Sequence, residues 1–527
     1  MRVLVFHGYL LRGTGSNVYN ASLVAALVRL GHDVQLLCQD RHAEEFEFVG
    51  AVGDWDSGEL AVEQVRSGGA TVYRPDIGGL LPVYVADRYE DIEARPFPEL
   101  SDAEVDTYIA ANVDAVAQVV ARRKPDVALA NHLIMGPVIL ARALAGTGVA
   151  YAVKVHGSAL EYTVKPHPRF LPYARDGIAQ AQGVLVGSRH TAESLWAAIG
   201  DPELPQRTRL GPPGVEISRF VPLQRADALA RVDELSRRIA ALPERSGDDD
   251  SAFSRDEAAT ASALADVARG APDDRLVTFV GKLIVSKGID LLLVAWPLVL
   301  AEVPSARLVV VGFGAYRDAC ERIVEALAAG DLDALRAFAD QGRAAEGGPR
   351  STLRFVAEFL DSLDEAANDG DRDRYLAAAT SASERVVFTG RLEHDEVADL
   401  LPLCEAMVVP STFPESFGMV AAEAAACGAL PVSAAHSGLA EVSRVLAASL
   451  PAQMRELLSF PLDGPVVRSI ADRLTGWLQA PSDVRDATRT ALVETVAAHY
   501  SWESVARTVI AAARGELDTL EPPRLER

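Results

Sequence analysis

The sequence predicts an α/β protein with two doubly wound parallel-sheet domains that face a central cleft. Short β-branched runs alternate with longer amphipathic segments over the first 211 residues, and the same alternation restarts at Arg275. A segment rich in proline and glycine lies between the two regions. Alternating strands and helices are typical of parallel sheets covered by helices on both faces. We therefore expect a domain at residues 1–211, an interdomain crossing at 212–225 and a second domain at 275–499.

The first domain is expected to open with a βαβ unit. A strand at residues 3–6 leads through a polar turn at 13–17 into a helix at 18–30, and a second strand follows at 34–38. Later strands are expected at 127–130, 150–155 and 183–186. The crossing contains Pro212, Pro213, Gly214 and Pro222, and prolines stiffen the chain while glycine allows it to pivot.

The second domain repeats the pattern. We expect strands at 276–280, 306–311, 385–388 and 406–409, and helices at 290–300, 419–427 and 442–458. Two acidic stretches interrupt the alternation and are interpreted as insertions. Residues 226–274 should combine helices with a polar linker around the aspartates at 248–250, and residues 331–384 should be helical.

Composition excludes several classes of protein. The chain has 527 residues, and 51 Lys and Arg against 74 Asp and Glu give a net charge of −23, which disfavours nonspecific binding to nucleic acids. No run approaches the roughly 18 apolar residues of a membrane-spanning helix, and the N-terminal apolar run is too short for a signal peptide. The cysteines are far apart, which disfavours disulfides or a structural zinc site and fits a cytoplasmic location. They are Cys38, Cys320, Cys404 and Cys427.

The strongest candidate site is the segment Pro-Ser-Thr-Phe-Pro-Glu-Ser-Phe-Gly-Met-Val-Ala-Ala-Glu at residues 410–423. It follows a strand and should enter a helix near Ser416, whose first amides can receive a phosphate or a sugar hydroxyl. Glu415 lies at the mouth of this helix and Glu423 about two turns deeper. Two carboxylates at this spacing can hold two parts of one polyhydroxylated ligand. The alternative is that Glu415 is only an acidic residue favoured by the helix dipole and that Glu423 is an ordinary surface glutamate.

Two lysines form a second candidate site. Lys282 follows the strand at 276–280, and Lys287 stands five residues later, before Gly288 turns the chain. Their ammonium groups can offset about two negative charges of a nucleotide diphosphate, as a divalent ion does elsewhere. The alternative is a pair of solvated surface lysines.

The spacing of Glu415 and Glu423 resembles the E-x7-E motif of glycosyltransferase family 4, which contains retaining enzymes with the GT-B fold of two Rossmann-like domains. Further segments resemble family motifs in the same order along both domains, but not in 226–274 or 331–384. The resemblance implies that residues 500–527 contain a closing helix that returns to the N-terminal, acceptor-side domain, followed by a tail. The matching segments are residues 153–158, 211–220, 279–290, 309–314, 387–391 and 500–506.

The resemblance also implies roles for individual residues. Lys282, Lys287 and Glu415 would act at the phosphates and the sugar, and His156 would contact the donor sugar from the opposite domain. Glu423 would hold the ribose hydroxyls. Contacts to the nucleotide sugar are implied for Gly15, Gly281, Arg391, Ser416, Phe417, Gly418, Met419, Val420 and Glu423. His7 and His132 also follow predicted strands and are candidates for the cleft lining. No metal ion or other cofactor is expected.

The implied activity is transfer of a hexosyl group from a UDP-, GDP- or ADP-linked sugar to a hydroxyl group, with retention of anomeric configuration. The acceptor would be a sugar, a glycolipid or a small molecule. Alternatives are a nucleotide-sugar epimerase or a phosphorylase on the same fold, or a non-catalytic scaffold that binds nucleotide sugars. Peripheral attachment to the inner face of the membrane stays open. The basic cluster at 122–124 is a candidate for such attachment but is interpreted as a helix end, since Pro125 follows it. The basic loop at 165–169 is interpreted as a solvated loop, with a contact to the acceptor as the alternative.

Overall fold

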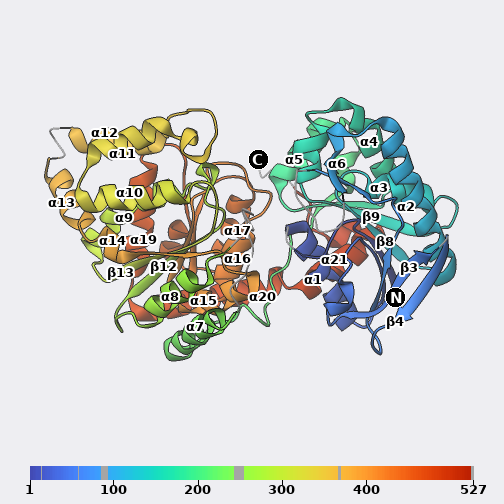
Figure 1. Cartoon of the computed structure of the whole chain (residues 1–527), viewed down its shortest axis with the longest axis horizontal. Helices are drawn as coiled ribbons and strands as arrows, with labels where there is room; N and C mark the ends of the chain where they lie inside the picture. The colour runs from blue at the N-terminus through green and yellow to red at the C-terminus, as the bar shows by residue number, and fades with distance from the viewer. Residues whose placement is uncertain (13–14, 57, 85–92, 243–254, 366–368, 524–527) are drawn as a thin grey trace. The chain divides into compact units, whose positions relative to one another are not determined.

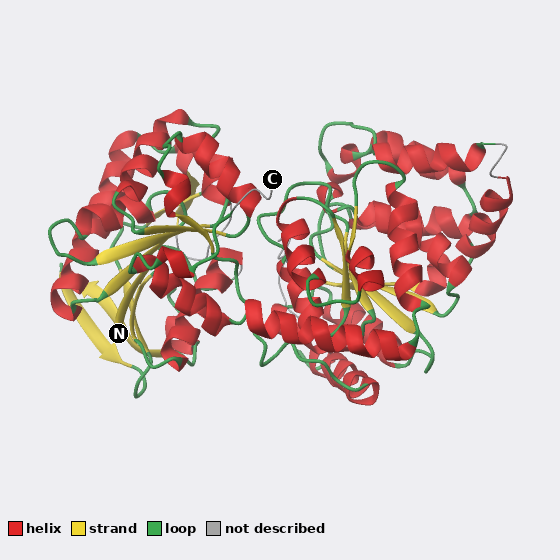
Figure 2. Ribbon diagram, turned by 180° about the vertical axis from the view of Figure 1, so that it is seen from behind, coloured by secondary structure: helices red, strands yellow, loops and turns green. Residues whose placement is uncertain are grey.

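The computed structural model describes residues 1–12, 15–56, 58–84, 93–242, 255–365 and 369–523. The chain divides into two units, which are described separately: unit 1 contains Met1–Gly214 and Tyr500–Arg527, and unit 2 contains Val215–His499 (Figure 1). In each unit a sheet lies between layers of helices (Figure 2). The predicted α/β class with two parallel-sheet domains is therefore confirmed.

The sheet of unit 1 has the strand order β11-β10-β9-β8-β1-β2-β5-β3-β4, and the neighbours are parallel except β3 and β4. A separate parallel pair joins β6 and β7. The strands are β1 (Arg2–Phe6), β2 (Asp33–Leu37), β3 (Val49–Asp56), β4 (Glu59–Gln64), β5 (Ala70–Arg74), β6 (Leu80–Val83), β7 (Glu93–Pro96), β8 (Val127–Asn131), β9 (Ala150–Val155), β10 (Gly183–Val186) and β11 (Thr208–Leu210).

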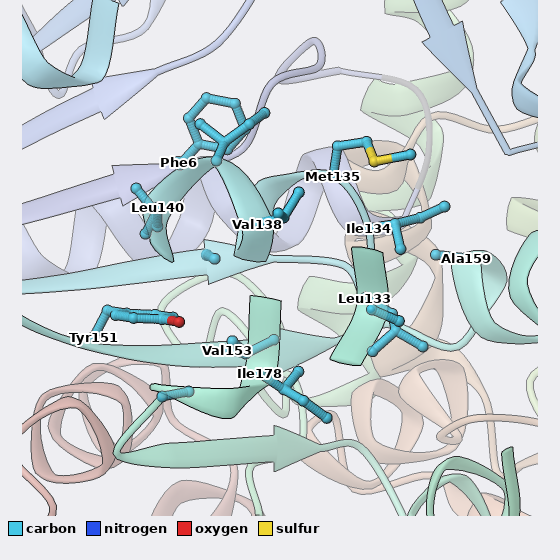
Figure 3. Close-up of a cluster of buried hydrophobic side chains, with 14 of the residues drawn as sticks. Phe6, Leu133, Ile134, Met135, Val138, Leu140, Tyr151, Val153, Ala159 and Ile178 are labelled. Carbon is cyan, nitrogen blue, oxygen red and sulfur yellow. The ribbon is translucent and has the colours of Figure 1, made fainter. Parts of the chain in front are cut away.

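Helices cover both faces of this sheet and bury its central strands. On one face α3 and α4 pack over Phe6, Tyr151 and Val153 (Figure 3). On the other face Trp502 of α21 packs in the same apolar cluster as α1. The helices are α1 (Gly15–Arg29), α2 (Asp102–Arg123), α3 (Gly136–Ala143), α4 (Leu171–Ala179), α5 (Arg189–Ile199), α6 (Leu204–Arg207) and α21 (Trp502–Ala513).

The sheet of unit 2 is wholly parallel within the described residues, with the order β14-β13-β12-β15-β16-β17. Its longest apolar helix, α9, continues through Pro297 and is buried along most of its length. No helix that the structure describes combines the length and the apolar character needed to cross a bilayer. The strands are β12 (Arg275–Val280), β13 (Ala306–Val311), β14 (Val386–Gly390), β15 (Ala406–Val409), β16 (Leu430–Ala434) and β17 (Ser459–Phe460).

Both predicted insertions contribute helices that pack against unit 2. In the first, α7 and α8 lie against each other and α8 lies beside β14, while the aspartates at 248–250 fall outside the described residues. In the second, α11 packs on α10, and α12 and α13 pack on α9. The helices are α7 (Arg225–Ala240), α8 (Glu257–Ala268), α9 (Ile289–Glu302), α10 (Arg317–Ala329), α11 (Leu332–Gln341), α12 (Arg354–Asp364), α13 (Asp369–Ala379), α14 (Ala382–Arg385), α15 (His394–Leu400), α16 (Met419–Ala426), α17 (Ser437–Ala447), α18 (Ala452–Arg455), α19 (Val466–Leu478) and α20 (Ser482–His499).

The helix predicted at 419–427 is confirmed as α16. Its first residue is Met419 and not Ser416, near which the chain was expected to enter the helix, because the backbone of Glu415 is engaged by Ser437 and Gly438 instead of by a helical turn. One element prediction in unit 2 was wrong. The helix expected at 442–458 is α17, which starts earlier and ends at Ala447. Pro451 lies shortly after, where a proline disfavours helical geometry in the residue before it.

Candidate functional site

The loops that follow β12 and β15 meet at the carboxyl edge of the unit 2 sheet. The two strands are hydrogen-bonded neighbours, so the chain segments that leave them lie side by side. The amide of Thr412 donates to the carbonyl of Ser286 at 2.9 Å and ties the two loops together. This contact brings the predicted lysine loop to the predicted glutamate loop, at the edge where open parallel sheets bind ligands.

Lys287, Glu415 and Ser411 form one polar cluster at this edge. The Lys287 ammonium is ion-paired with the Glu415 carboxylate, and the Ser411 hydroxyl donates to the same carboxylate oxygen at 2.8 Å. Ser411 is buried, whereas Lys287 and Glu415 are partly exposed. An ammonium carries three protons, so Lys287 can keep this bond and still donate to an anion.

The glutamate loop is held in place by the residues that follow β16. His436 Nε2 donates to the carbonyl of Ser411 at 2.7 Å, which makes Nδ1 the acceptor in the neutral ring. The Ser437 hydroxyl donates to this Nδ1 at 3.1 Å and accepts from the Glu415 amide at 2.9 Å. No role was predicted for His436 or Ser437, because the strand that precedes them, β16, was itself not predicted.

Lys282 and the glycines of the lysine loop differ from Lys287 in their burial and in their contacts. Lys282 is exposed, and its ammonium makes no hydrogen bond or ion pair with the residues that the structure describes, although its carbonyl accepts from the Ile284 amide at 3.1 Å. Gly281 is half-buried. Gly288 has φ +69°, and a Cβ there would lie 2.0 Å from the carbonyl oxygen of Pro410. Only glycine lets the two loops approach this closely.

Glu423 is paired with a histidine for which the sequence predicted no role. Its carboxylate is buried and lies 2.8 Å from His394 Nε2. Burial alone would lower the pKa of His394, but the hydrogen bond to Glu423 and the charge of that carboxylate raise it. The pair is therefore a histidine–carboxylate ion pair over a wider pH range than an isolated histidine would allow.

The remaining predicted donor contacts lie around the start of α16 and after β14. Gly418 is the N-cap, so the amides of Met419 and Val420 have no partner inside the helix. Ser416 is exposed, and Phe417, Met419 and Val420 are half-buried. Arg391 is ion-paired with Glu393 at 2.9 Å, and its guanidinium lies 5.6 Å from the centre of the Phe313 ring.

Unit 1 brings three histidines together at the carboxyl ends of three adjacent strands. His7, His132 and His156 follow β1, β8 and β9, and the His132 ring centre lies 5.7 Å from that of His7 and 5.0 Å from that of His156. His156 Nε2 donates to Asn131 at 2.9 Å. Burial lowers the pKa of His7 to about 4 and that of His156 well below its usual value, so the cluster is neutral.

His132 is the unusual member of this cluster. It is buried, its φ is +67°, and neither ring nitrogen has a hydrogen-bond partner among the residues that the structure describes. The rings of Tyr9 and Tyr84 pack around it, with centres 5.2 and 4.8 Å away. A buried polar group without a partner lowers the stability of the fold by about 1–3 kcal/mol. Such a group at a strand end is a candidate ligand contact.

Unit 1 also holds the other sequence-predicted groups. Gly15 begins α1, and apart from its chain neighbours and the backbone of its own helix, no atom of the described residues lies within 4 Å of the place where its Cβ would stand. Gly13 and Thr14 lie outside the described residues. Lys124 ends α2, as predicted for the basic cluster. In the basic loop, Arg169 is exposed, as the interpretation of a solvated loop requires, and its guanidinium also donates to the carbonyls of residues 97, 98 and 100.

A cavity of about 410 Å³ opens at the carboxyl ends of β2 and β5 in unit 1. Guanidinium, carboxylate and indole groups line it, a mixture suited to hydroxyl-rich ligands. The lining residues include Gln39, Arg41, Asp54, Trp55, Arg74 and Asp76. Within the described ranges, no three side chains of His, Cys, Asp and Glu are grouped as metal ligands are.

Two family models match this chain. Residues 14–214 match the glycosyl transferase 4-like domain, and residues 367–445 match the glycosyl transferases group 1 domain. The D-inositol 3-phosphate glycosyltransferases of Mycobacterium tuberculosis and Mycobacterium bovis are 30% identical over 153 residues. The match spans 29% of this chain and 29% of each of those relatives.

Solved structures resemble the fold over nearly the whole chain. Sucrose-phosphate synthase from Thermosynechococcus elongatus aligns with a TM-score of 0.54 and 18% identity, covering 98% of this chain and 99% of that one. Anabaena Alr3699/HepE in complex with UDP gives 0.54 and 14%, covering 99% and 100%. The catalytic domain of starch synthase IV from Arabidopsis thaliana, bound to ADP and acarbose, gives 0.54 and 12%, covering 98% and 99%. The shared fold is GT-B.

Proposed function

Because the chain carries a glycosyl transferase 4-like domain and a glycosyl transferases group 1 domain on a GT-B fold, we propose that it is a retaining hexosyltransferase. It moves a hexosyl group from a nucleotide-diphosphate sugar to an acceptor hydroxyl and needs no metal ion. UDP and ADP are the first nucleotides to test, since Alr3699/HepE was solved with UDP and starch synthase IV with ADP.

The cluster of Lys287, Glu415 and Ser411 is the observation that carries this proposal. It combines a cation for phosphate with a carboxylate for sugar hydroxyls at one sheet edge. The amides of Met419 and Val420, at the start of α16, add donors that need no counterion. Lys282 supplies a second positive charge in the same loop.

In the proposed reaction, the bond between the anomeric carbon and the β-phosphate oxygen breaks while the acceptor oxygen bonds to that carbon from the same face. Negative charge grows on the departing phosphate, and Lys282, Lys287 and the α16 amides bind it more strongly as it grows. The phosphate oxygen takes the proton of the acceptor hydroxyl. No protein nucleophile is required in this scheme.

The pair formed by Glu423 and His394 suits the nucleoside end of the donor. A carboxylate that accepts from the two ribose hydroxyls must be correctly turned, and the hydrogen bond with the His394 ring holds the Glu423 carboxylate in one orientation. This assignment extends the E-x7-E motif by one residue that lies outside it.

The neutral histidine cluster of unit 1 is suited to binding the acceptor. His132 can donate to or accept from a hydroxyl, and Tyr9 and Tyr84 offer aromatic faces to a sugar ring or a polyol. His156 would contact the sugar being transferred. The cavity beside β2 and β5 would hold a more distant part of a sugar, glycolipid or small-molecule acceptor.

A thermal-shift series with UDP-, GDP- and ADP-linked sugars, each with and without magnesium, tests the donor. The proposal predicts a shift from one nucleotide class that magnesium does not change and that Lys287→Ala loses. Arg354→Ala is the control, since this arginine is exposed on α12 of the same unit. No shift from any donor would favour the scaffold hypothesis.

Product analysis tests the chemistry. Incubation of the preferred donor with a panel of sugar and polyol acceptors should give a glycoside, and the anomeric coupling constant in its proton NMR spectrum reports retention or inversion. Conversion of the donor without any acceptor would instead identify an epimerase.

A further inference from the structure

The insertion between β13 and β14 contacts the lysine loop through one carboxylate. The amide of Val285 donates to Glu346 Oε2 at 2.7 Å. Val285 begins the short 3-10 helix η5 (Val285–Lys287), whose preceding residue, Ile284, provides no side-chain cap. Glu346 therefore caps, from a distant part of the chain, the helical turn that ends in Lys287.

The position of Glu346 is itself fixed by its surroundings. It ends the 3-10 helix η6 (Arg343–Glu346), and its carboxylate is almost fully buried and accepts from Arg343 Nε at 2.9 Å. Gly342, just before this helix, has φ +51°, and a Cβ there would lie 1.6 Å from the carbonyl oxygen of Ser351. The chain segments before and after η6 therefore lie close together.

The same insertion supports the lysine loop along a second route. The ring of Phe338 in α11 lies 5.7 Å from that of Tyr316, just before α10. The amide of Tyr316 donates to the carbonyl of Leu283, whose own amide donates to the carbonyl of Phe313. The loop after β12 is therefore held by backbone contacts on one side and by Glu346 on the other.

We propose that Glu346 is a positioning residue, through which the insertion at 331–384 holds the loop at 281–288 in the geometry that presents Lys287 to the donor diphosphate. This inference rests on the proposed function for the identity of the ligand. A carboxylate so close to an anion site has no use as a phosphate contact, because like charges repel. Its use is the hydrogen bond to Val285, which orders the turn before the anion arrives and so lowers the entropic cost of binding.

Three variants separate this role from general destabilisation. Glu346→Ala removes the acceptor, Glu346→Gln keeps an acceptor oxygen without the charge, and Glu346→Asp withdraws it by one methylene. Glu358→Ala is the matched control, because Glu358 lies exposed on α12 of the same insertion and is paired with Arg354, one turn earlier in that helix. Losing a hydrogen bond to a charged group corresponds to about tenfold or more in an equilibrium constant.

Two measurements are made on the full chain. Hydrogen exchange of the peptide at 281–288 reports loop order without any ligand, and calorimetric titration with UDP, GDP and ADP reports affinity. We expect Glu346→Ala and Glu346→Asp to exchange faster in this peptide and to bind the preferred nucleotide about tenfold more weakly, with Glu346→Gln close to wild type. Glu358→Ala should change neither quantity.

Unchanged exchange in Glu346→Ala would overturn the positioning role, and so would a similar loss of affinity in Glu358→Ala. Faster exchange without any loss of affinity would refute the link between the loop and the donor. If the wild-type chain binds none of the nucleotides, the proposed function fails, while the exchange measurement still decides whether Glu346 orders the loop.

Discussion

Replacing Asp290 by asparagine should stabilise unit 2, and by more at alkaline pH than at acid pH. Asp290 lies in the first turn of α9 and is only 3% exposed, and within the described part of the chain its Oδ1 atom has no hydrogen-bond partner. Burial raises the pKa of this carboxyl from its usual 3.8 to about 7, and the charge of Glu346 adds to the effect. Asparagine has nearly the same shape and cannot ionise.

The magnitude follows from proton linkage. Between pH 4 and pH 7 the folded chain keeps a proton on Asp290 that the unfolded chain has released, so the free energy of unfolding falls as the pH rises. Because the pKa of Asp290 is raised by about 3, the free energy of unfolding falls by about 4 kcal/mol in total, and this full loss is reached above pH 7. Between pH 5 and pH 8 alone, the wild type should lose about 2–3 kcal/mol that Asp290→Asn keeps.

Hydrogen exchange of the α9 peptide measures this difference within unit 2. Opening free energies of the wild type and of Asp290→Asn are compared at pH 5 and pH 8, after correction for the intrinsic exchange rates. We expect the advantage of the variant to grow by about 2–3 kcal/mol between the two pH values. A constant difference between the two proteins would show that Asp290 does not titrate in this range, and would refute the reasoning.

Three other substitutions give separate tests. Gly288→Ala should destabilise unit 2 by at least about 2 kcal/mol in chemical denaturation, because its Cβ would meet the Pro410 carbonyl; an unchanged midpoint would contradict this. His132→Phe should raise stability by about 1–2 kcal/mol and reduce transfer to the acceptor without weakening the donor, so a loss of donor affinity would argue against an acceptor role. Donor affinity should fall as the pH rises through the raised pKa of His394, when the ring loses the charge that pairs with Glu423; His394→Ala should remove that pH dependence, and its persistence would point to another group.

The strands that flank the site could be predicted because their chemistry is uniform. Buried parallel strands such as β10 and β15 are continuous apolar runs, and each was predicted with its observed bounds. By contrast, β4 exposes nearly all its side chains and the neighbouring β3 contains Gly50 and Gly53, so no hydrophobic period marks this antiparallel hairpin. Its formation depends on β5, which is already in the sheet.

The site was predictable only where it depends on a local motif. Glu415 and Glu423 stand in one segment, and their spacing was informative by itself. His394 and Glu346 reach the site from other elements through tertiary contacts, and nothing in their own neighbourhoods of the sequence indicates these partners. Residues of this kind are found only once the strands have been arranged in space.

Unit 1 is formed by two separate segments of the chain, so it cannot complete its folding until synthesis on the ribosome is almost finished. Its sheet is complete once residue 210 has emerged, but the helix that covers one face of β8, β9 and β10 is α21, which starts at Trp502. Unit 2, an uninterrupted segment from Val215 to His499, is translated in between. A nascent chain therefore carries an uncovered apolar face while about 290 further residues are added. Stop codons shortly before Trp502 should for this reason produce an aggregating N-terminal unit attached to an intact C-terminal one.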